Sequence, residues 1–233
     1  SIPGVFVIKR MSSNFFESNK TVLVSEVLVA SLRWYREDVF PSVGVTTSLD
    51  TLEKDEGQFD DIKEIFWATG ACLFIRKTAF QEVDGFDEDF FAHQEEIDLC
   101  WRLLSKGGTI KYVGTSSVFH VGGATLAAAN SKKTFYNFRN TLLVLVKNVQ
   151  GLQLWPIIFT RLVLDGMAGI QFLLQGKPKH TIAIIKAHLS FYLLLPKMFK
   201  KRALNAMSLN YFFVNLIVWD YFFLKKRTFK DLL

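Results

Sequence analysis

The sequence is poor in cysteine, with only Cys72 and Cys100 among its 233 residues. Two cysteines exclude a disulfide scaffold and a four-cysteine zinc site, and their apolar neighbours predict buried thiols. The HExxH, paired CxxC and GxxxxGKS/T patterns are also missing, so a zincin, a zinc ribbon and a P-loop have no support. No repeat of 20–50 residues is visible.

Acidic residues are scarce in the second part of the chain. Residues 131–233 contain only three and carry a formal charge of +13, whereas residues 1–130 carry −7. We therefore expect two regions with different partners, residues 1–130 and residues 131–233. The second region is both basic and apolar, which suits an anionic membrane surface. Nucleic acid is not expected as a partner, because a nucleic-acid-binding arm rarely carries so many Leu, Ile and Phe.

Half of the residues are hydrophobic, which is enough to build a core and too many for a disordered chain. Short apolar runs predict strands, and residues 51–64 are acidic and predict an exposed loop. The expected strands are Val5–Ile8, Ile65–Trp67, Cys72–Ile75, Thr109–Val113 and Ser117–His120, the last two separated by a turn around Gly114. The expected helices of this region are Lys77–Val83 and Phe90–Ser105.

The second region predicts mainly helices, at Phe135–Asn148, Leu152–Leu174, Thr181–Leu195 and Ala203–Leu224. Ala203–Leu224 is the candidate for a membrane span, and it contains three Asn and Asp220. The alternatives are a true span, an ordinary helical core, or helices lying in the membrane interface. We favour the interface, with Trp155, Trp219, Tyr211 and Tyr221 at headgroup depth.

The densest chemical pattern is GFDEDFFAHQEEIDLCWRL, in which Glu95, Glu96 and Asp98 stand at the expected start of a helix. One interpretation is simple charge complementation, because acids are favoured at a helix N-terminus. The other is a catalytic site, because crowded carboxylates raise one another's pKa and can thereby become general bases. The pattern alone leaves both interpretations open.

Two further patterns are weaker. His120 closes the apolar strand SSVFH, and a single histidine in this place is usually a core or surface residue. The triplet Asp87-Glu88-Asp89 could hold Mg²⁺ or Mn²⁺ with a diphosphate, but such triplets are common by chance.

Taken in order, these motifs resemble a known family. The stretch ATGACLFIRKTAFQEVDGFDEDFFAHQEEIDLCWRLLSKGGTIKYVGTSSVFHVGG resembles the second half of the catalytic domain of a family-2 glycosyltransferase, in the rhamnosyltransferase-like branch with the GT-A fold. The resemblance covers residues 66–126 most strongly. The tail is similar to the C-terminal helices of the same branch through KTFYNFRN and VWDYFFLKK. The implied fold class is α/β: a partial, Rossmann-like GT-A domain in residues 1–130 and a helical, membrane-associated region in residues 131–233.

The resemblance also implies roles for single residues. Glu96 matches the catalytic base, although the family more often has Asp there. We assign Asp98 to the same catalytic site, as the acid that orients the helix start. His120 matches a ligand of the divalent metal, Mg²⁺ or Mn²⁺. The acceptor-side positions are Trp67, Thr69, Gly70 and Asp87. Because Asp87 falls on the acceptor side, the resemblance argues against a metal-binding role for the triplet that it opens.

The implied activity is inverting transfer of a sugar from a nucleotide-diphosphate donor to a glycan or lipid-linked glycan in cell-surface polysaccharide synthesis. The place would be the cytoplasmic face of the membrane. The family's nucleotide-binding half, with its acidic triplet, is not found in this sequence, so we expect an incomplete fragment with little activity alone. The alternative is a non-catalytic, membrane-associated helical protein in which the acids only cap a helix.

Overall fold

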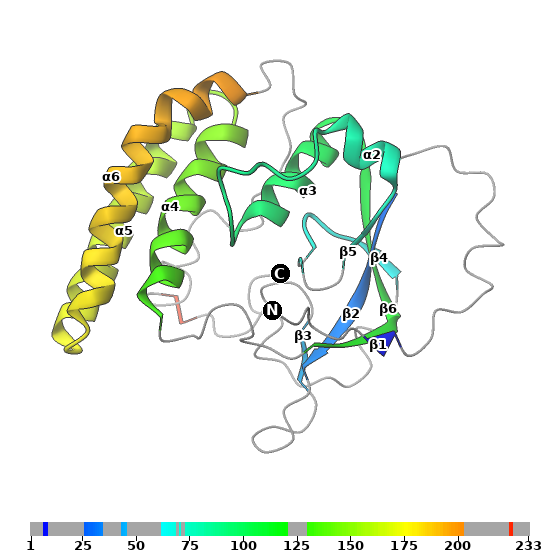
Figure 1. Cartoon of the computed structure of the whole chain (residues 1–233), viewed down its shortest axis with the longest axis horizontal. Helices are drawn as coiled ribbons and strands as arrows, with labels where there is room; N and C mark the ends of the chain where they lie inside the picture. The colour runs from blue at the N-terminus through cyan, green and yellow to red at the C-terminus, as the bar shows by residue number, and fades with distance from the viewer. Residues whose placement is uncertain are drawn as a thin grey trace. The chain divides into compact units, whose positions relative to one another are not determined.

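In a computed structural model of the chain, the described residues are 7–8, 26–34, 43–45, 62–68, 70, 73–120, 130–202 and 224–225. They belong to two compact units, one built on a sheet and one built on helices. Figure 1 labels the elements of both units along the chain.

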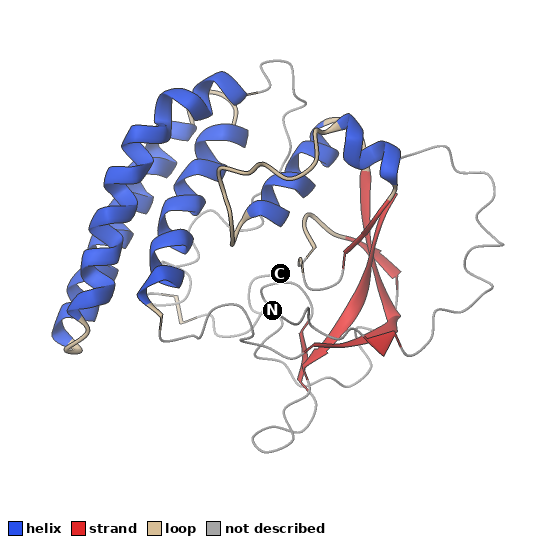
Figure 2. Cartoon of the chain, viewed as in Figure 1, coloured by secondary structure: helices blue, strands red, loops and turns tan. Residues whose placement is uncertain are grey.

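The sheet unit contains six described strands, drawn in red in Figure 2. The strands are β1 (Val7–Ile8), β2 (Glu26–Trp34), β3 (Val43–Val45), β4 (Ile62–Glu64), β5 (Leu73–Ile75) and β6 (Thr109–His120). Strands β2 and β6 run parallel at its centre, and the other pairings are antiparallel. The mixed sheet agrees with the α/β class predicted from the sequence, and β1 and β5 confirm two of the expected strands.

Strand β6 corrects one prediction, because it is continuous where a turn around Gly114 was expected. Its pairing with β2 passes from Ala30 opposite Val113 to Ser31 opposite Ser117. The intervening residues of β6 therefore form an irregularity of the bulge type, which lets a strand continue through a glycine-containing segment.

The prediction of a strand at Ile65–Trp67 is also wrong. The observed strand, β4, begins three residues earlier. This strand falls within the expected loop 51–64 and pairs with β6, with Lys63 opposite Tyr112. Ile65 continues the contact by donating its backbone N–H to the carbonyl of Ile110 at 2.9 Å. The polar sequence IKE forms a strand because its partner supplies backbone hydrogen bonds, which local hydrophobicity does not reveal.

The described part of the chain contains five helices, drawn in blue in Figure 2. They are α2 (Lys77–Glu82), α3 (Glu95–Ser105), α4 (Ser131–Asn148), α5 (Leu154–Leu174) and α6 (Pro178–Lys201). The core of the helical unit is formed by apolar side chains with almost no exposure. These include Phe90, Leu99, Cys100, Leu142, Leu143, Val146, Ala187, Phe191 and Met198. Cys100 is buried as predicted, and Cys72 lies outside the described residues.

Helix α3 begins five residues later than predicted. The sequence favoured a start at Phe90, but Phe91, His93 and Gln94 have φ angles of 60°, 66° and 73°. These left-handed conformations cannot continue a right-handed helix. The first helical residues are therefore Glu95 and Glu96, and the segment before them is an irregular loop.

Helices α5 and α6 are longer than average and form an antiparallel hairpin packed against α4 (Figure 1). Both are long and apolar enough to cross a membrane, with mean hydropathies of 1.6 and 1.4. Helix α6 extends beyond the predicted Thr181–Leu195 at both ends, with Pro178 in its first turn and Pro196 inside it. Of the span considered at Ala203–Leu224, only Leu224 belongs to the part of the chain that the structure describes.

Candidate active site

A cavity of about 560 Å³ opens in the helical unit beside the turn that follows α2. Its lining comes from the turn itself, from α3, from α4 and from the last turns of α6. The lining residues are Val83, Asp84, Phe86, Asp87, Glu88, Asp89, Arg102, Lys147, Lys197 and Lys201. Four of these side chains are acidic and four are basic, so the wall has little net charge but many hydrogen-bonding groups.

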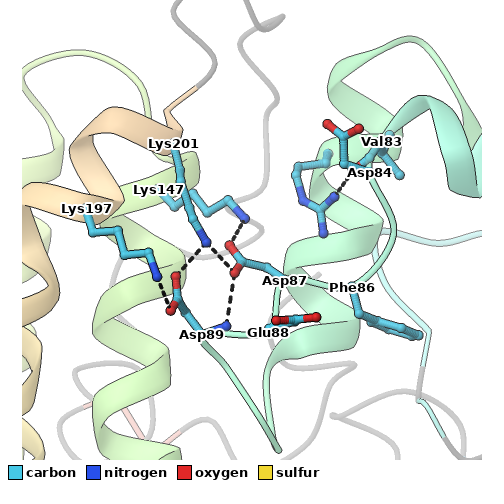
Figure 3. Close-up of a pocket in the computed structure, with 10 residues that line it drawn as sticks. Val83, Asp84, Phe86, Asp87, Glu88, Asp89, Lys147, Lys197 and Lys201 are labelled. Atoms are coloured by element: carbon cyan, nitrogen blue, oxygen red, sulfur yellow. Dashed lines mark hydrogen bonds and ion pairs between the residues drawn. The ribbon is translucent and has the colours of Figure 1, made fainter.

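Three lysines converge on two carboxylates of this wall, as Figure 3 shows. Lys147 Nζ lies 2.6 Å from Asp87 Oδ2, and Lys201 Nζ lies 2.5 Å from Asp87 Oδ1. Lys201 also lies 2.6 Å from Asp89 Oδ2, and Lys197 lies 2.6 Å from Asp89 Oδ1. We call Asp87, Asp89, Lys147, Lys197 and Lys201 the lysine cluster. It ties the turn to α4 and to the end of α6.

The lysines change the acidity of both carboxyl groups. Burial alone would raise the pKa of Asp87, but the hydrogen bonds from Lys147 and Lys201 outweigh burial and lower this pKa from 3.8 to about 2. Burial opposes the shift at Asp89 as well, and Lys197 and Lys201 lower its pKa. Both groups are therefore carboxylates at neutral pH.

Asp98 is the centre of a second group of polar contacts. Its side chain has no exposed surface. It lies 2.9 Å from Lys147 Nζ and 2.8 Å from Arg102 Nη2, and it accepts a hydrogen bond of 2.9 Å from Asn148 Nδ2. A buried carboxylate is tolerated only when it is paired in this way. Lys147 thus links Asp98 to Asp87.

Arg102 joins α3 to the turn on the other side. Its guanidinium donates to the carbonyl oxygens of Val83 and Gly85, the latter at 2.8 Å, and to Asp98. Gly85 has a φ of +64°, and a Cβ atom there would lie 2.9 Å from Phe80 Cζ. Glycine is favoured at this left-handed φ, and any side chain there would require Phe80 to shift, which explains the Asp84-Gly85 signal in the sequence.

Arg139 and Asn140 of α4 hold the loop that precedes α3. The Asn140 amide, which is fully buried, donates to the carbonyls of Phe90, Ala92 and His93 at 2.7–2.8 Å. Arg139 donates to the carbonyl of Asp89 at 2.8 Å. These side chains thus supply hydrogen-bond donors to backbone carbonyls of a loop that contains left-handed residues and belongs to no helix or strand.

Glu95 and Glu96 stand directly after this loop, in the first turn of α3, and both are half-buried. The partial positive charge of the helix N-terminus favours carboxylates in this turn. The neighbouring His93 has its pKa lowered by burial and by Lys133, so its ring is neutral near pH 7. The first turn thus offers two half-buried carboxylates directly after a loop held by α4, and a carboxylate is one of the groups that can act as a general base.

The predicted site residues are divided between the two units. Glu96, Asp98 and Asp87 belong to the helical unit, and Asp87 lines the cavity. Trp67, Gly70 and His120 belong to the sheet unit: Trp67 is half-buried, Gly70 is in an exposed turn, and His120 ends β6. Thr69 and the side chain of His120 lie outside the described residues. The roles of all the predicted site residues remain predictions.

The triplet Asp87-Glu88-Asp89 does not fit a metal ion. The oxygens of Asp87 and Asp89 already face three ammonium groups, which would repel a divalent cation. Within the described ranges no group of three His, Cys, Asp or Glu side chains could hold a metal. These contacts argue against a metal-binding role for the triplet, and the acceptor-side role of Asp87 remains a prediction.

Sequence reasoning missed Lys147, Lys197, Lys201 and Asn140. The lysines lie 60–114 residues from Asp87 in the chain, and such a separation leaves no periodic pattern. The one available signal was KTFYNFRN, which contains Arg139 and Asn140 and which indicates the family without indicating their contacts.

The mixed sheet and the helices place the chain in the α/β class. Comparison with known sequences specifies the family. The family model described as glycosyl transferase family group 2 matches residues 8–195. The chain belongs to this family, as the sequence motifs predicted, and membership implies the GT-A fold.

Named relatives match shorter stretches. The N-acetylglucosaminyl-diphospho-decaprenol L-rhamnosyltransferase of Mycobacterium tuberculosis is 40% identical over 58 residues, 25% of this chain and 19% of that protein. Rhamnosyltransferase WbbL of Escherichia coli is 30% identical over 81 residues, 35% and 31% of the two chains. The pre-mycofactocin glycosyltransferase of M. tuberculosis is 32% identical over 72 residues, 31% and 15%. The chain thus spans less than a third of the length of each of these relatives.

Proposed function

We propose that this chain forms the acceptor side of an inverting glycosyltransferase that acts in cell-surface polysaccharide synthesis. The observation that carries the proposal is the first turn of α3, where Glu96 stands between the loop held by Asn140 and the buried group of Asp98. This turn lies within the segment matched by the family model. The relatives named as rhamnosyltransferases favour a hexosyl donor of the rhamnosyl type, carried on a nucleotide diphosphate.

In the proposed reaction, a carboxylate oxygen of Glu96 takes the proton of the attacking acceptor hydroxyl. The hydroxyl oxygen bonds to the anomeric carbon from the side opposite the nucleotide. The bond from that carbon to the diphosphate oxygen breaks, and the diphosphate leaves with the electron pair. Proton removal of this kind contributes about 10²–10⁴-fold to the rate. Asp98 does not touch the substrate in this scheme and acts as a positioning residue for the turn.

Asp87 and the cavity are proposed to receive part of the acceptor. Glu88 is exposed and Phe86 is nearly half exposed, so carboxylate oxygens and an aromatic ring are both available to a glycan. Carboxylates accept hydrogen bonds from sugar hydroxyls, and aromatic faces pack against sugar C–H groups. Trp67, Thr69 and Gly70 are also proposed to bind the acceptor, on the strength of the family resemblance.

In this proposal the metal has the role that the family resemblance gives it. A divalent ion, Mg²⁺ or Mn²⁺, would neutralise the leaving diphosphate when bound, and His120 is its proposed ligand in this chain. The second region, residues 131–233, is proposed to keep the enzyme at the cytoplasmic face of an anionic membrane, where lipid-linked acceptors lie.

Product analysis tests this function. The gene product that contains this chain is incubated with nucleotide-diphosphate sugars, Mn²⁺ and a lipid-linked glycan extract, and the product is isolated. Proton NMR then gives the anomeric configuration of the new linkage. We expect the configuration opposite to that of the donor. A retained configuration would contradict the single displacement, and absence of transfer with every donor would favour the non-catalytic alternative.

A further inference from the structure

The α5–α6 hairpin has a strongly apolar outer surface. Its inner side is covered by contacts with α4 and between the two helices, through residues such as Ile158, Gly169, Ala187 and Phe191. Thirteen large apolar or aromatic side chains on the two helices are nevertheless exposed. On α5 they are Trp155, Phe159, Val163, Met167, Ile170, Leu173 and Leu174, and on α6 they are Ile182, Ile185, Leu189, Tyr192, Leu193 and Phe199.

These exposed side chains follow the helical repeat. On α6 they recur from Ile182 to Tyr192 at intervals of three and four residues, and Phe199 follows two turns later, which aligns them on one face. On α5 the exposed apolar side chains recur at the same spacing from Trp155 to Leu174. Proteins that remain in water rarely expose contiguous apolar patches above a few hundred Å². The two stripes therefore need an apolar partner.

The charge on the hairpin selects the kind of partner. Residues 152–202 contain eight basic side chains and one acid, Asp165, and carry a formal charge of +7. Asp165 is buried, and its oxygens lie 2.7 Å from Arg161 Nε and 3.1 Å from His188 Nε2. The hairpin consequently presents no acid to solvent. A second copy would bring the same positive charge, whereas an anionic bilayer complements it.

The position of the basic groups also argues for a hairpin that lies along the membrane. Lys177 and Lys179 stand at the turn, and Lys197 and Lys201 at the other end are tied to Asp89 and Asp87. Lys186 is exposed and is the ninth of the 24 residues of α6. A spanning helix would carry Lys186 into the hydrocarbon, where a lysine costs up to about 2.5–3.5 kcal/mol on insertion scales. In the interface its long side chain reaches the headgroups instead.

We infer that the α5–α6 hairpin is the membrane-binding surface of this chain, lying in the plane of an anionic leaflet with its apolar stripes among the acyl chains. The inference rests on the membrane association proposed above for residues 131–233 and names the surface responsible. It also gives the lysine cluster a second role. The cluster connects the end of the membrane-bound helix α6 to the turn that carries Asp87.

Vesicle sedimentation tests the inference without any assay of sugar transfer. The full chain is mixed with vesicles of phosphatidylcholine alone or with one quarter phosphatidylglycerol. The test variant is Leu189→Glu with Leu193→Glu on the stripe of α6. The matched control is Thr78→Glu with Gln81→Glu, which adds the same charge at exposed polar positions of α2, outside the hairpin. Circular dichroism verifies that both variants keep the helical content of the parent.

We expect the parent to bind the anionic vesicles at least about tenfold more strongly than the neutral ones. The stripe variant should lose at least about tenfold in binding, and the control less than about threefold. Trp155 supplies a second measure, because its emission should shift to the blue on binding and this shift should vanish in Trp155→Phe. Equal binding by the two Glu variants would overturn the inference.

Two further outcomes would also overturn it. Loss of a dimer in the stripe variant, seen by analytical ultracentrifugation together with unchanged vesicle binding, would show that a second copy covers the stripes. Retention of the hairpin on vesicles through an alkaline carbonate wash would indicate a span and not an in-plane helix. Loss of sugar transfer with normal vesicle binding would contradict only the proposed function.

Discussion

Single side chains in this protein connect segments that are far apart in the sequence. Asp98 contacts Arg102 of its own helix and Lys147 and Asn148 of α4. Lys147 also forms an ion pair with Asp87. The crowding of acids at the expected helix start predicted a site at Glu96 and Asp98, and the family resemblance added Asp87 on the acceptor side. The sequence could not predict the cations opposite Asp87, because a pairing over 60 residues is set by packing and has no local pattern.

The lysine cluster predicts a particular loss of stability in acid. The pKa of Asp87 is about 2 in the folded protein, against an ordinary value of 3.8 that applies to the unfolded chain. A carboxyl group whose pKa is lower in the folded protein than in the unfolded chain stabilises the fold. This stabilisation is complete at pH values above the pKa of the unfolded chain, and it is lost as the pH falls to the pKa of the folded protein. Asp87 should therefore contribute about 2 kcal/mol at pH 5 that is largely lost by pH 2.

Urea unfolding of the parent and of Asp87→Asn at pH 5, 4, 3 and 2 measures this contribution. The difference in the free energy of unfolding between the two proteins should shrink by about 2 kcal/mol between pH 5 and pH 2. Asp84→Asn, at an exposed position of the same turn outside the lysine cluster, is the control and should show little difference at any pH. A constant difference for Asp87→Asn would contradict the ion-pair assignment.

At the scale of elements, the helices and the C-terminal ends of α3, α4 and α5 were predicted correctly, whereas the starts of α3, α4 and α6 were not. The apolar periodicity placed α4, α5 and α6, because one face of each helix is buried. The start of α3 was placed too early, because nothing in the letters FFAHQ reveals three left-handed residues. The carbonyls of Phe90, Ala92 and His93 in this loop accept hydrogen bonds from Asn140, which lies in a different helix. Strand β4 was missed for a similar reason, since its partner β6 supplies what its polar sequence lacks.

The loop before α3 should therefore depend on one amide. Asn140→Asp replaces the donor facing the carbonyls of Phe90, Ala92 and His93 with a carboxylate oxygen that repels them. We expect a loss of about 3 kcal/mol in the free energy of unfolding, because buried carbonyls lose their partner. Sugar transfer should also fall, because Glu96 is positioned by this loop.

The matched control is Asn137→Asp, half-buried one turn earlier on α4. Urea unfolding gives the stability, and the transfer rate is measured at a temperature where both variants remain folded. A smaller kcat with an unchanged KM for the donor is expected for Asn140→Asp, because the base is displaced and donor contacts are not. Equal behaviour of the two variants would show that the amide does not position the loop.

At the scale of the whole molecule, the sequence predicted the family because its motifs occur in a fixed order over residues 66–126. The family model then extended the relationship to residues 8–195. The long parallel pairing of β2 with β6 was not predicted, because β2 lies in a segment without Gly or Pro punctuation. The apolar outer face of the α5–α6 hairpin was also not predicted, because only the structure distinguishes the buried side chains of the two helices from the exposed ones.

The central claim is that Glu96 is the base of a glycosyl transfer, and the rate of transfer by Glu96→Gln tests it most directly. The gene product that contains this chain is compared with Glu96→Gln and with Glu95→Gln, the adjacent carboxylate in the same turn of α3. Because glutamine keeps the size and cannot take the proton, kcat should fall about 10²–10⁴-fold in Glu96→Gln. Donor binding should survive, and Glu95→Gln should lose less than about tenfold. A Glu96→Gln variant that transfers sugar as fast as Glu95→Gln would contradict the assignment of the base.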